Sequence, residues 1–202
     1  MTVSIRPQIL THPNIPKPLH GVAPRAIKGR EWWDKTRQEA YKATNFRCAA
    51  CGIHKNSAAW HPWLEAHEYY DVDYKNGVVR LIEIVALCHS CHNFIHSGRM
   101  TALWEKKEIE SGKAKLILEH GFRQLRRIKA KPNPVAAMLW CRIKGLPDPE
   151  AVLKSAGIKP QVVEPWRSVP WDEWYLDFEG RWHYSLFEDE EDWAAHYNQM
   201  NT

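Results

Sequence analysis

Four of the five cysteines in this 202-residue chain form two Cys-x-x-Cys pairs, Cys48 with Cys51 and Cys88 with Cys91. Each pair supplies two thiolates from one tight turn, and two such pairs are typical of a tetrahedral zinc site. The N-terminus has no charged start followed by an apolar core, so we expect an intracellular, cytoplasmic protein whose cysteines stay reduced. The sequence therefore predicts one structural Zn²⁺ held by four cysteines, and it places Cys141 in the apolar core.

Histidines near the second cysteine pair point to a further metal site. His92 and His96 are four residues apart, so they share one face if a helix begins near Cys91. Cys91 lies about 100° from His92 around such a helix, so the cysteine can bind the zinc while both imidazoles face elsewhere. With His67 as third ligand, this set predicts a second divalent ion, Mg²⁺, Mn²⁺ or Zn²⁺. Alternatively, His92 and His96 extend one structural zinc cluster that has no catalytic role, and His67 is a core histidine bonded to a carboxylate.

Two carboxylates lie close to His67 in the sequence, Glu65 and Glu68. Side chains alternate along a strand, so Glu65 and His67 face one way and Glu68 faces the other. Two further histidines, His54 and His61, follow the first cysteine pair, and we expect both at the surface.

Residues 46–98 resemble the HNH nucleases, a family with a ββα-metal core, similar to a treble clef, and flanking Cys-x-x-Cys pairs. The family pattern places Leu-Glu-x-His-His on a strand and Leu-Cys-x-x-Cys-His at the start of a helix, with a further metal ligand one turn later. The matching segments here are Leu64-Glu65-Ala66-His67-Glu68 and Leu87-Cys88-His89-Ser90-Cys91-His92, followed by His96. The resemblance implies that the four cysteines bind structural zinc and that His67, His92 and His96 bind the catalytic metal.

Two positions depart from the family pattern. Glu68 replaces the second histidine of the pair, which is the general base, and Glu83 replaces the asparagine that orients it. A carboxylate can activate water beside a metal ion, so we expect Glu68 to act as the base. In the other alignment His67 is the base, but Ala66 then occupies a ligand position and cannot bind metal. The catalytic candidates are therefore Glu68 and His67.

A hairpin and a helix must position these groups. Segments Trp60–Tyr74 and Val78–Leu87 have strand character, and Asn76-Gly77 between them is a strong turn signal. A helix is expected from about Ser90, and another over Glu31–Ala43.

The remaining chain predicts additional helices and a C-terminal hairpin–helix unit on an α+β fold. We expect helices over 101–129, with breaks near Gly112 and Gly121, and a further helix over 135–143. A linker over 145–170, a hairpin over 174–187 and a helix over 188–197 should follow. The domain prediction is a Pro-rich extended arm at 1–29, an HNH-like zinc-binding core at 30–100, a basic helical region at 101–145, and a linker with an acidic Trp-rich subdomain at 146–202.

The net charge of +4 hides a strong asymmetry. Residues 99–144 carry +8, whereas residues 164–202 carry −8. A basic helical region can bind a phosphate backbone, with Arg123, Arg126 and Arg127 as candidate contacts. The acidic C-terminal region would repel nucleic acid and is a candidate surface for a protein partner. No apolar run approaches the ~20 residues that a membrane span requires, so no membrane partner is expected.

These features together predict a metal-dependent, HNH-like endonuclease that hydrolyses DNA phosphodiester bonds. The alternative is a non-catalytic, zinc-stabilised protein that binds nucleic acid or another protein. The two glutamates at altered positions favour the alternative, and the retained histidines favour the enzyme.

Overall fold

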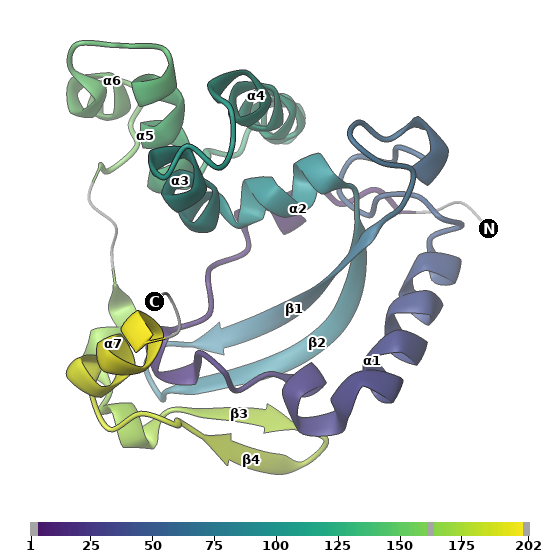
Figure 1. The fold of residues 1–202 in the computed structure, drawn as a ribbon, viewed down its shortest axis with the longest axis vertical. Coiled ribbons are helices and arrows are strands. Elements are labelled where there is room, and N and C mark those ends of the chain that lie inside the picture. Colours follow the sequence, from purple (N-terminus) through teal and green to yellow (C-terminus); the bar gives the residue numbers. More distant parts are fainter. Residues whose placement is uncertain (1–3, 161–163, 200–202) are drawn as a thin grey trace. The chain divides into compact units, whose positions relative to one another are not determined.

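The structure is a computed structural model that describes residues 4–160 and 164–199. Within these residues the fold is α+β, as predicted, with seven α-helices and one four-stranded sheet (Figure 1). Among the described helices, none combines the length and the apolar character that a membrane span requires.

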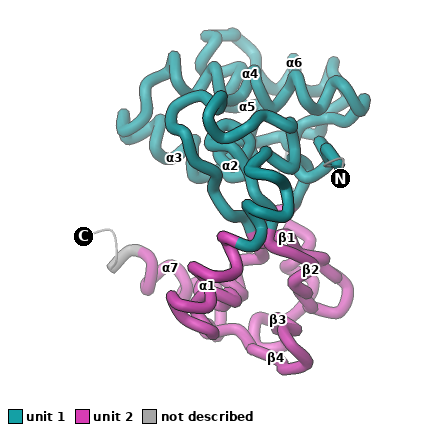
Figure 2. The backbone as a smooth tube through the Cα atoms, turned by 90° about the vertical axis from the view of Figure 1, so that its right-hand side faces the viewer, with its two compact units in different colours: residues 1–12, 39–67, 85–163 teal, residues 13–38, 68–84, 164–202 magenta. Residues whose placement is uncertain are grey.

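The chain folds into two compact units, each built from three separate stretches (Figure 2). Unit 1 contains Met1–His12, Glu39–His67 and Val85–Val163, and unit 2 contains Pro13–Gln38, Glu68–Ile84 and Glu164–Thr202. The predicted domains, 1–29, 30–100, 101–145 and 146–202, are consecutive segments and do not coincide with these units. The reason is that three elements pass from one unit into the other: α1 (Pro24–Ala43), β1 (Glu65–Asp73) and β2 (Val78–Leu87).

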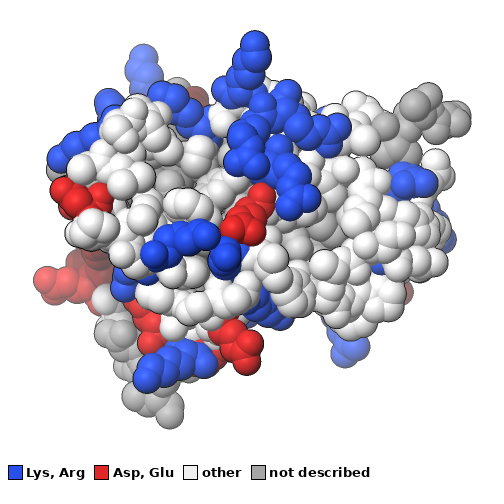
Figure 3. All heavy atoms as spheres, turned by 90° about the horizontal axis from the view of Figure 1, so that it is seen from above, with Lys and Arg blue, Asp and Glu red and all other residues white. Residues whose placement is uncertain are grey.

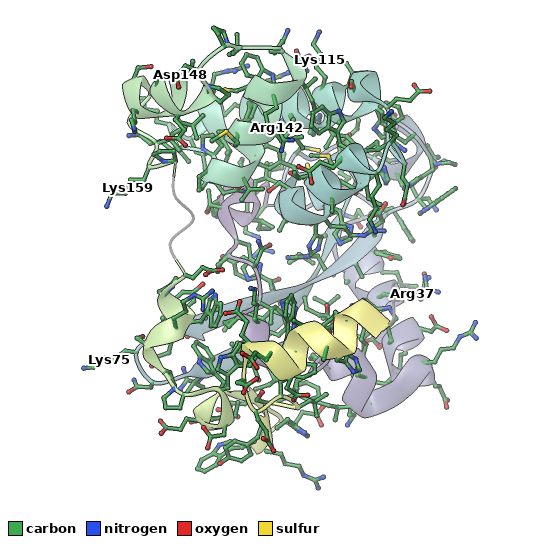
Figure 4. The ribbon with its side chains drawn as sticks, turned by 60° about the vertical axis from the view of Figure 1, so that its left-hand side comes forward. Arg37, Lys75, Lys115, Arg142, Asp148 and Lys159 are labelled. Atoms are coloured by element: carbon green, nitrogen blue, oxygen red, sulfur yellow. The ribbon has the colours of Figure 1, made fainter. Side chains whose placement is uncertain are left out.

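Unit 1 is mainly helical. Its helices are α2 (His89–Ile95), α3 (Ser97–Glu105), α4 (Ser111–Arg127), α5 (Pro134–Ile143) and α6 (Pro149–Ser155), with short 3₁₀ turns η1 (Pro7–Thr11) and η3 (Lys55–Ser57). Asn133 and Asp148, the latter labelled in Figure 4, each accept a hydrogen bond from a backbone N–H in the first turn of α5 and α6. A proline follows each cap, so both helix starts are encoded locally.

The expected interruption near Gly112 exists, because α3 ends at Glu105 and α4 begins at Ser111. The expected break near Gly121 is wrong, since Gly121 lies inside α4. A Cβ atom at Gly121 would come within 2.1 Å of the Phe94 ring. The glycine therefore serves a close approach of α4 to α2 instead of ending the helix.

The sheet has the order β1-β2-β3-β4, with β3 at Tyr175–Phe178 and β4 at Arg181–Tyr184. Within unit 2, β2 pairs with β3 in parallel over Val78–Arg80, and β3 pairs with β4 antiparallel. The predicted turn before β2 is present, with Gly77 at a φ of +68°. The first strand begins at Glu65 and not at Trp60, because Trp60 has a φ of +83°, outside the β region.

The expectation of an extended arm over residues 1–29 is wrong. This segment forms η1, then η2 (Lys17–Leu19), then the start of α1, which is kinked at Gly29 (φ +80°). Apolar residues between the prolines explain the difference, because Ile9, Leu10 and Leu19 are each only 1% exposed. Their burial ties the segment to the two cores.

The acidic C-terminal region is not a separate subdomain. Trp166, Trp174 and Leu176 share one buried cluster with Leu19 and Val79 from the earlier part of unit 2. The final helix, α7 (Glu190–Gln199), is anchored by Glu190, whose carboxylate accepts from Lys17 at 2.6 Å and Arg167 at 2.7 Å. The hairpin and helix predicted from sequence are present, but they complete unit 2.

Candidate metal centres

The four paired cysteines converge in unit 1. Their Sγ atoms lie within 4.8 Å of one another, and Cys51 Sγ is 3.8 Å from Cys88 Sγ. Tetrahedral zinc with Zn–S bonds of about 2.3 Å separates its sulphur ligands by about 3.8 Å. The cluster therefore has the donor type, number and spacing to hold a metal ion such as zinc, as predicted.

Local backbone geometry builds this cluster from two chain segments. In the first, the N–H of Gly52 donates to the carbonyl of Cys48 at 2.8 Å, and Gly52 adopts a φ of +78° that favours glycine. In the second, Cys88 is the N-cap of α2, which places Cys91 in its first turn. The N–H of Ala49 donates to the carbonyl of Ala86 at 2.8 Å and holds the two segments together.

Hydrogen bonds link the sulphurs to one another and to His120. Hydrogen bonds from Cys51, Cys88 and Cys91 hold the pKa of the Cys48 thiol well below its usual value, whereas the hydrogen bond with Cys48 raises the pKa of Cys91. His120 from α4 places Nε2 3.4 Å from Cys91 Sγ, where an N–H can donate to a thiolate. Outer hydrogen bonds of this kind orient metal ligands.

The three predicted histidines also converge in unit 1. One ring nitrogen from each of His67, His92 and His96 lies within 4.8 Å of the others. His67 projects from β1 and is 5% exposed, His92 lies on α2, and His96 is the residue that caps the end of α2. The predicted helical spacing is therefore confirmed, and the strand supplies the third imidazole.

Two further side chains support this histidine cluster. Glu65 Oε2 accepts a hydrogen bond from His92 Nδ1, so His92 Nε2 is left for a metal ion. Burial raises the pKa of the Glu65 carboxyl, but hydrogen bonds to His89 and His92 outweigh it and hold that pKa far below its usual value. His12, from the N-terminal segment, places Nδ1 3.1 Å from His67 Nε2. No spacing in the sequence links His12 to the later histidines.

A third cluster, missed by the sequence analysis, joins His61, Glu65 and His89. The expectation that His61 lies at the surface is wrong, since its side chain is only 13% exposed and contacts Glu65. A signal for part of this cluster is present in the sequence. His89, His92 and His96 have helical spacing, and Glu65 alternates with His67 on its strand.

The candidate base Glu68 has other neighbours. Glu68 belongs to unit 2, where its Oε1 lies 3.7 Å from Arg25 Nε, and its side chain is 12% exposed. Burial raises the pKa of the nearby Tyr70, and the negative charge of Glu68 raises it further. Among the described residues, Glu68 is not part of the cluster of converging histidines.

The predicted phosphate contacts lie on the last turns of α4. Arg123, Arg126 and Arg127 are all exposed, and Arg127 Nη1 donates to Gln124 Oε1 at 2.9 Å. Figure 3 shows lysine and arginine side chains gathered on a face of the molecule over its helical part. Unit 1 contains 18 lysines and arginines against eight acidic residues, a net charge of +10.

Comparison with models of known protein families, with curated proteins and with solved structures finds no match to this chain.

Proposed function

We propose that this protein is a metal-dependent, HNH-like endonuclease whose catalytic centre is the histidine cluster of unit 1. The observation that carries the proposal is the convergence of His67, His92 and His96 within 4.8 Å, from a strand and the helix that follows it. Three neutral ligands leave coordination positions for water and a phosphate oxygen. The chain order β1, β2, α2 is also the order of elements in a ββα core, which supports the sequence resemblance.

The residues of unit 1 have distinct tasks in this proposal. The four cysteines bind structural zinc and hold the start of α2. His67, His92 and His96 would hold a divalent ion, which when bound would stabilise negative charge on the phosphate and the leaving oxygen. Glu65 keeps the His92 ring in the tautomer whose Nε2 can bind metal.

Two side chains are candidates for moving the proton of the attacking water. Glu68 is the first, and His67 is the alternative if it is not a metal ligand. The exposed arginines of α4 bind the DNA backbone through its phosphates, supported by the +10 charge of unit 1.

A specific observation favours the second candidate function, a zinc-stabilised binding protein without catalysis. The carboxylate of Glu68 is mostly buried and forms an ion pair with Arg25. A base held in this way is less available to water.

A cleavage assay tests the proposal. The protein is expected to cut DNA with added Mg²⁺ or Mn²⁺. His92→Ala and His96→Ala should abolish cutting and should retain the zinc at the four cysteines. His183→Ala, on β4 of unit 2, is the matched control and should cut at the wild-type rate.

Glu68→Gln separates the two candidates for the base. Loss of a general base is expected to slow cutting by about 10²–10⁴-fold. If Glu68→Gln cuts normally and His67→Ala does not, His67 is the base. If no metal supports cutting of single- or double-stranded DNA, the binding protein replaces the nuclease.

A further inference from the structure

The cluster of His61, Glu65 and His89 has no task in the proposed nuclease centre. His61 comes from the loop before β1, Glu65 from the start of β1 and His89 from the first turn of α2, all within unit 1. Their side chains are 13%, 23% and 19% exposed, so the cluster is largely shielded and still open to a small ion.

The three facing atoms have the spacing of metal ligands. His89 Nδ1 is 2.7 Å from Glu65 Oε1, His61 Nε2 is 3.0 Å from the same oxygen, and the two nitrogens are 3.2 Å apart. Ligands in tetrahedral geometry, 2.0–2.1 Å from a zinc ion, lie about 3.3 Å from one another. An ion just outside the plane of the three atoms can therefore reach all of them with small adjustments.

The hydrogen bonds of His61 add an independent argument. Its Nδ1 lies 3.2 Å from the carbonyl oxygen of Trp63 and must donate a proton there, because a carbonyl only accepts. In the neutral ring, Nε2 then carries a lone pair directed at Glu65 Oε1. Two acceptors facing each other repel unless a proton or a metal cation lies between them.

The other oxygen of the same carboxylate is already engaged. Glu65 Oε2 accepts from His92 Nδ1, which leaves Oε1 as the atom that faces His61 and His89. One carboxylate thus contacts both histidine groups, through different oxygens.

The loop around His61 is held in place by specific contacts. The Trp63 ring stacks on His61, with centroids 3.9 Å apart and an interplanar angle of 4°. Trp60 Nε1 donates to Ser90 Oγ at 3.2 Å and ties the loop to α2. Trp60 also adopts a φ of +83°, a rare conformation for a bulky residue that persists only where surrounding contacts impose it.

We propose that His61, Glu65 and His89 bind a divalent transition-metal ion, in addition to the ions at the cysteines and at His67, His92 and His96. Two imidazoles and one carboxylate suit Zn²⁺ or Co²⁺ better than Mg²⁺, which prefers oxygen ligands. Glu65 links this ion to the histidine cluster through His92. The proposal does not depend on the proposed nuclease activity.

Counting bound metal tests the new site. A mild chelator first removes metal from all sites except the four cysteines, which keep their zinc. The protein is then dialysed against Co²⁺ and analysed by native mass spectrometry. The wild type is expected to bind two Co²⁺ ions beside one zinc, and His61→Gln and His89→Gln one Co²⁺ each. His183→Gln, the matched control in unit 2, should bind two.

A variant of the other cluster separates the two sites. His96→Gln, which does not touch Glu65 in any described contact, should lose one Co²⁺ and keep the ion at His61. A wild type that binds one ion, lost in His61→Gln and kept in His96→Gln, supports the new site and refutes the three-histidine site. Three results would overturn the new site. The wild type binds no Co²⁺ ion, or it binds a single Co²⁺ ion that His61→Gln retains, or His61→Gln still binds two Co²⁺ ions.

Discussion

Unit 1 and unit 2 differ in charge and in the side chains at their centres. Unit 1 has a net charge of +10 and contains every candidate metal cluster found among the described residues. Unit 2 has ten basic and 16 acidic residues, a net charge of −6, and its core is aromatic and aliphatic, centred on the fully buried Trp174. Unit 1 has a large apolar core as well, with Phe94, Ile117 and Leu139 fully buried. The difference teaches that unit 2 depends on apolar burial, whereas unit 1 combines an apolar core with clusters that could hold metal ions.

Removing the zinc site is the strongest way to test this comparison. Cys88→Ser is expected to lose zinc and unfold much of unit 1, because structural zinc in small domains contributes about 10–16 kcal/mol of apparent binding free energy. Hydrogen exchange followed by mass spectrometry should show larger loss of protection in residues 85–127 than in residues 166–184.

Cys141→Ala serves as the control for cysteine loss, since Cys141 is buried but belongs to no metal cluster. It should retain the zinc at the four cysteines. Absence of zinc from the native protein, or equal melting of Cys88→Ser and wild type, would contradict metal-based stability in unit 1.

The matching experiment in unit 2 removes its largest buried side chain. Trp174 is 0% exposed, and its Nε1 donates to the carbonyl of Trp166 at 3.2 Å. Trp174→Ala is expected to lower the free energy of unfolding by about 3–5 kcal/mol, measured by denaturant titration. Trp182→Ala, at a 62% exposed position of β4, should cost less than ~1 kcal/mol. Zinc content should be unchanged in both, and zinc loss in Trp174→Ala would mean that the units are not stabilised separately.

A smaller effect is expected from packing within unit 1. Gly121→Ala would bring a Cβ atom within 2.1 Å of the Phe94 ring, and such overpacking costs about 1–3 kcal/mol. Gly112→Ala lies in the same helix with no atom within 4 Å, and it should stabilise the helix by ~0.4–1 kcal/mol. Thermal melting of both variants measures the difference. Equal melting temperatures for the two variants would show that α4 and α2 can move apart to accommodate the added Cβ atom without loss of stability.

Much of the local structure could be predicted because its signals are local. Asn76-Gly77 indicated the turn before β2, and Asn133-Pro134 begins the helix that was expected over 135–143. The linker expected over 145–170 is wrong, because α6 lies within it and begins with a similar local signal, Asp148-Pro149. The helical spacing of His92 and His96 likewise needed only residues close in sequence. Gly121 misled the prediction, because its role depends on Phe94, 27 residues earlier.

The sequence by itself determined the donor set: two cysteine pairs, a strand carrying Glu65 and His67, and a helix carrying His92 and His96. These depend on short-range periodicity, which the backbone imposes on any chain. Only the tertiary structure brought His61 to Glu65, brought His12 to His67 and paired Glu68 with Arg25. Contacts between Glu68 and Arg25, or between His12 and His67, depend on how apolar segments distant in sequence pack together, and no local spacing records that packing.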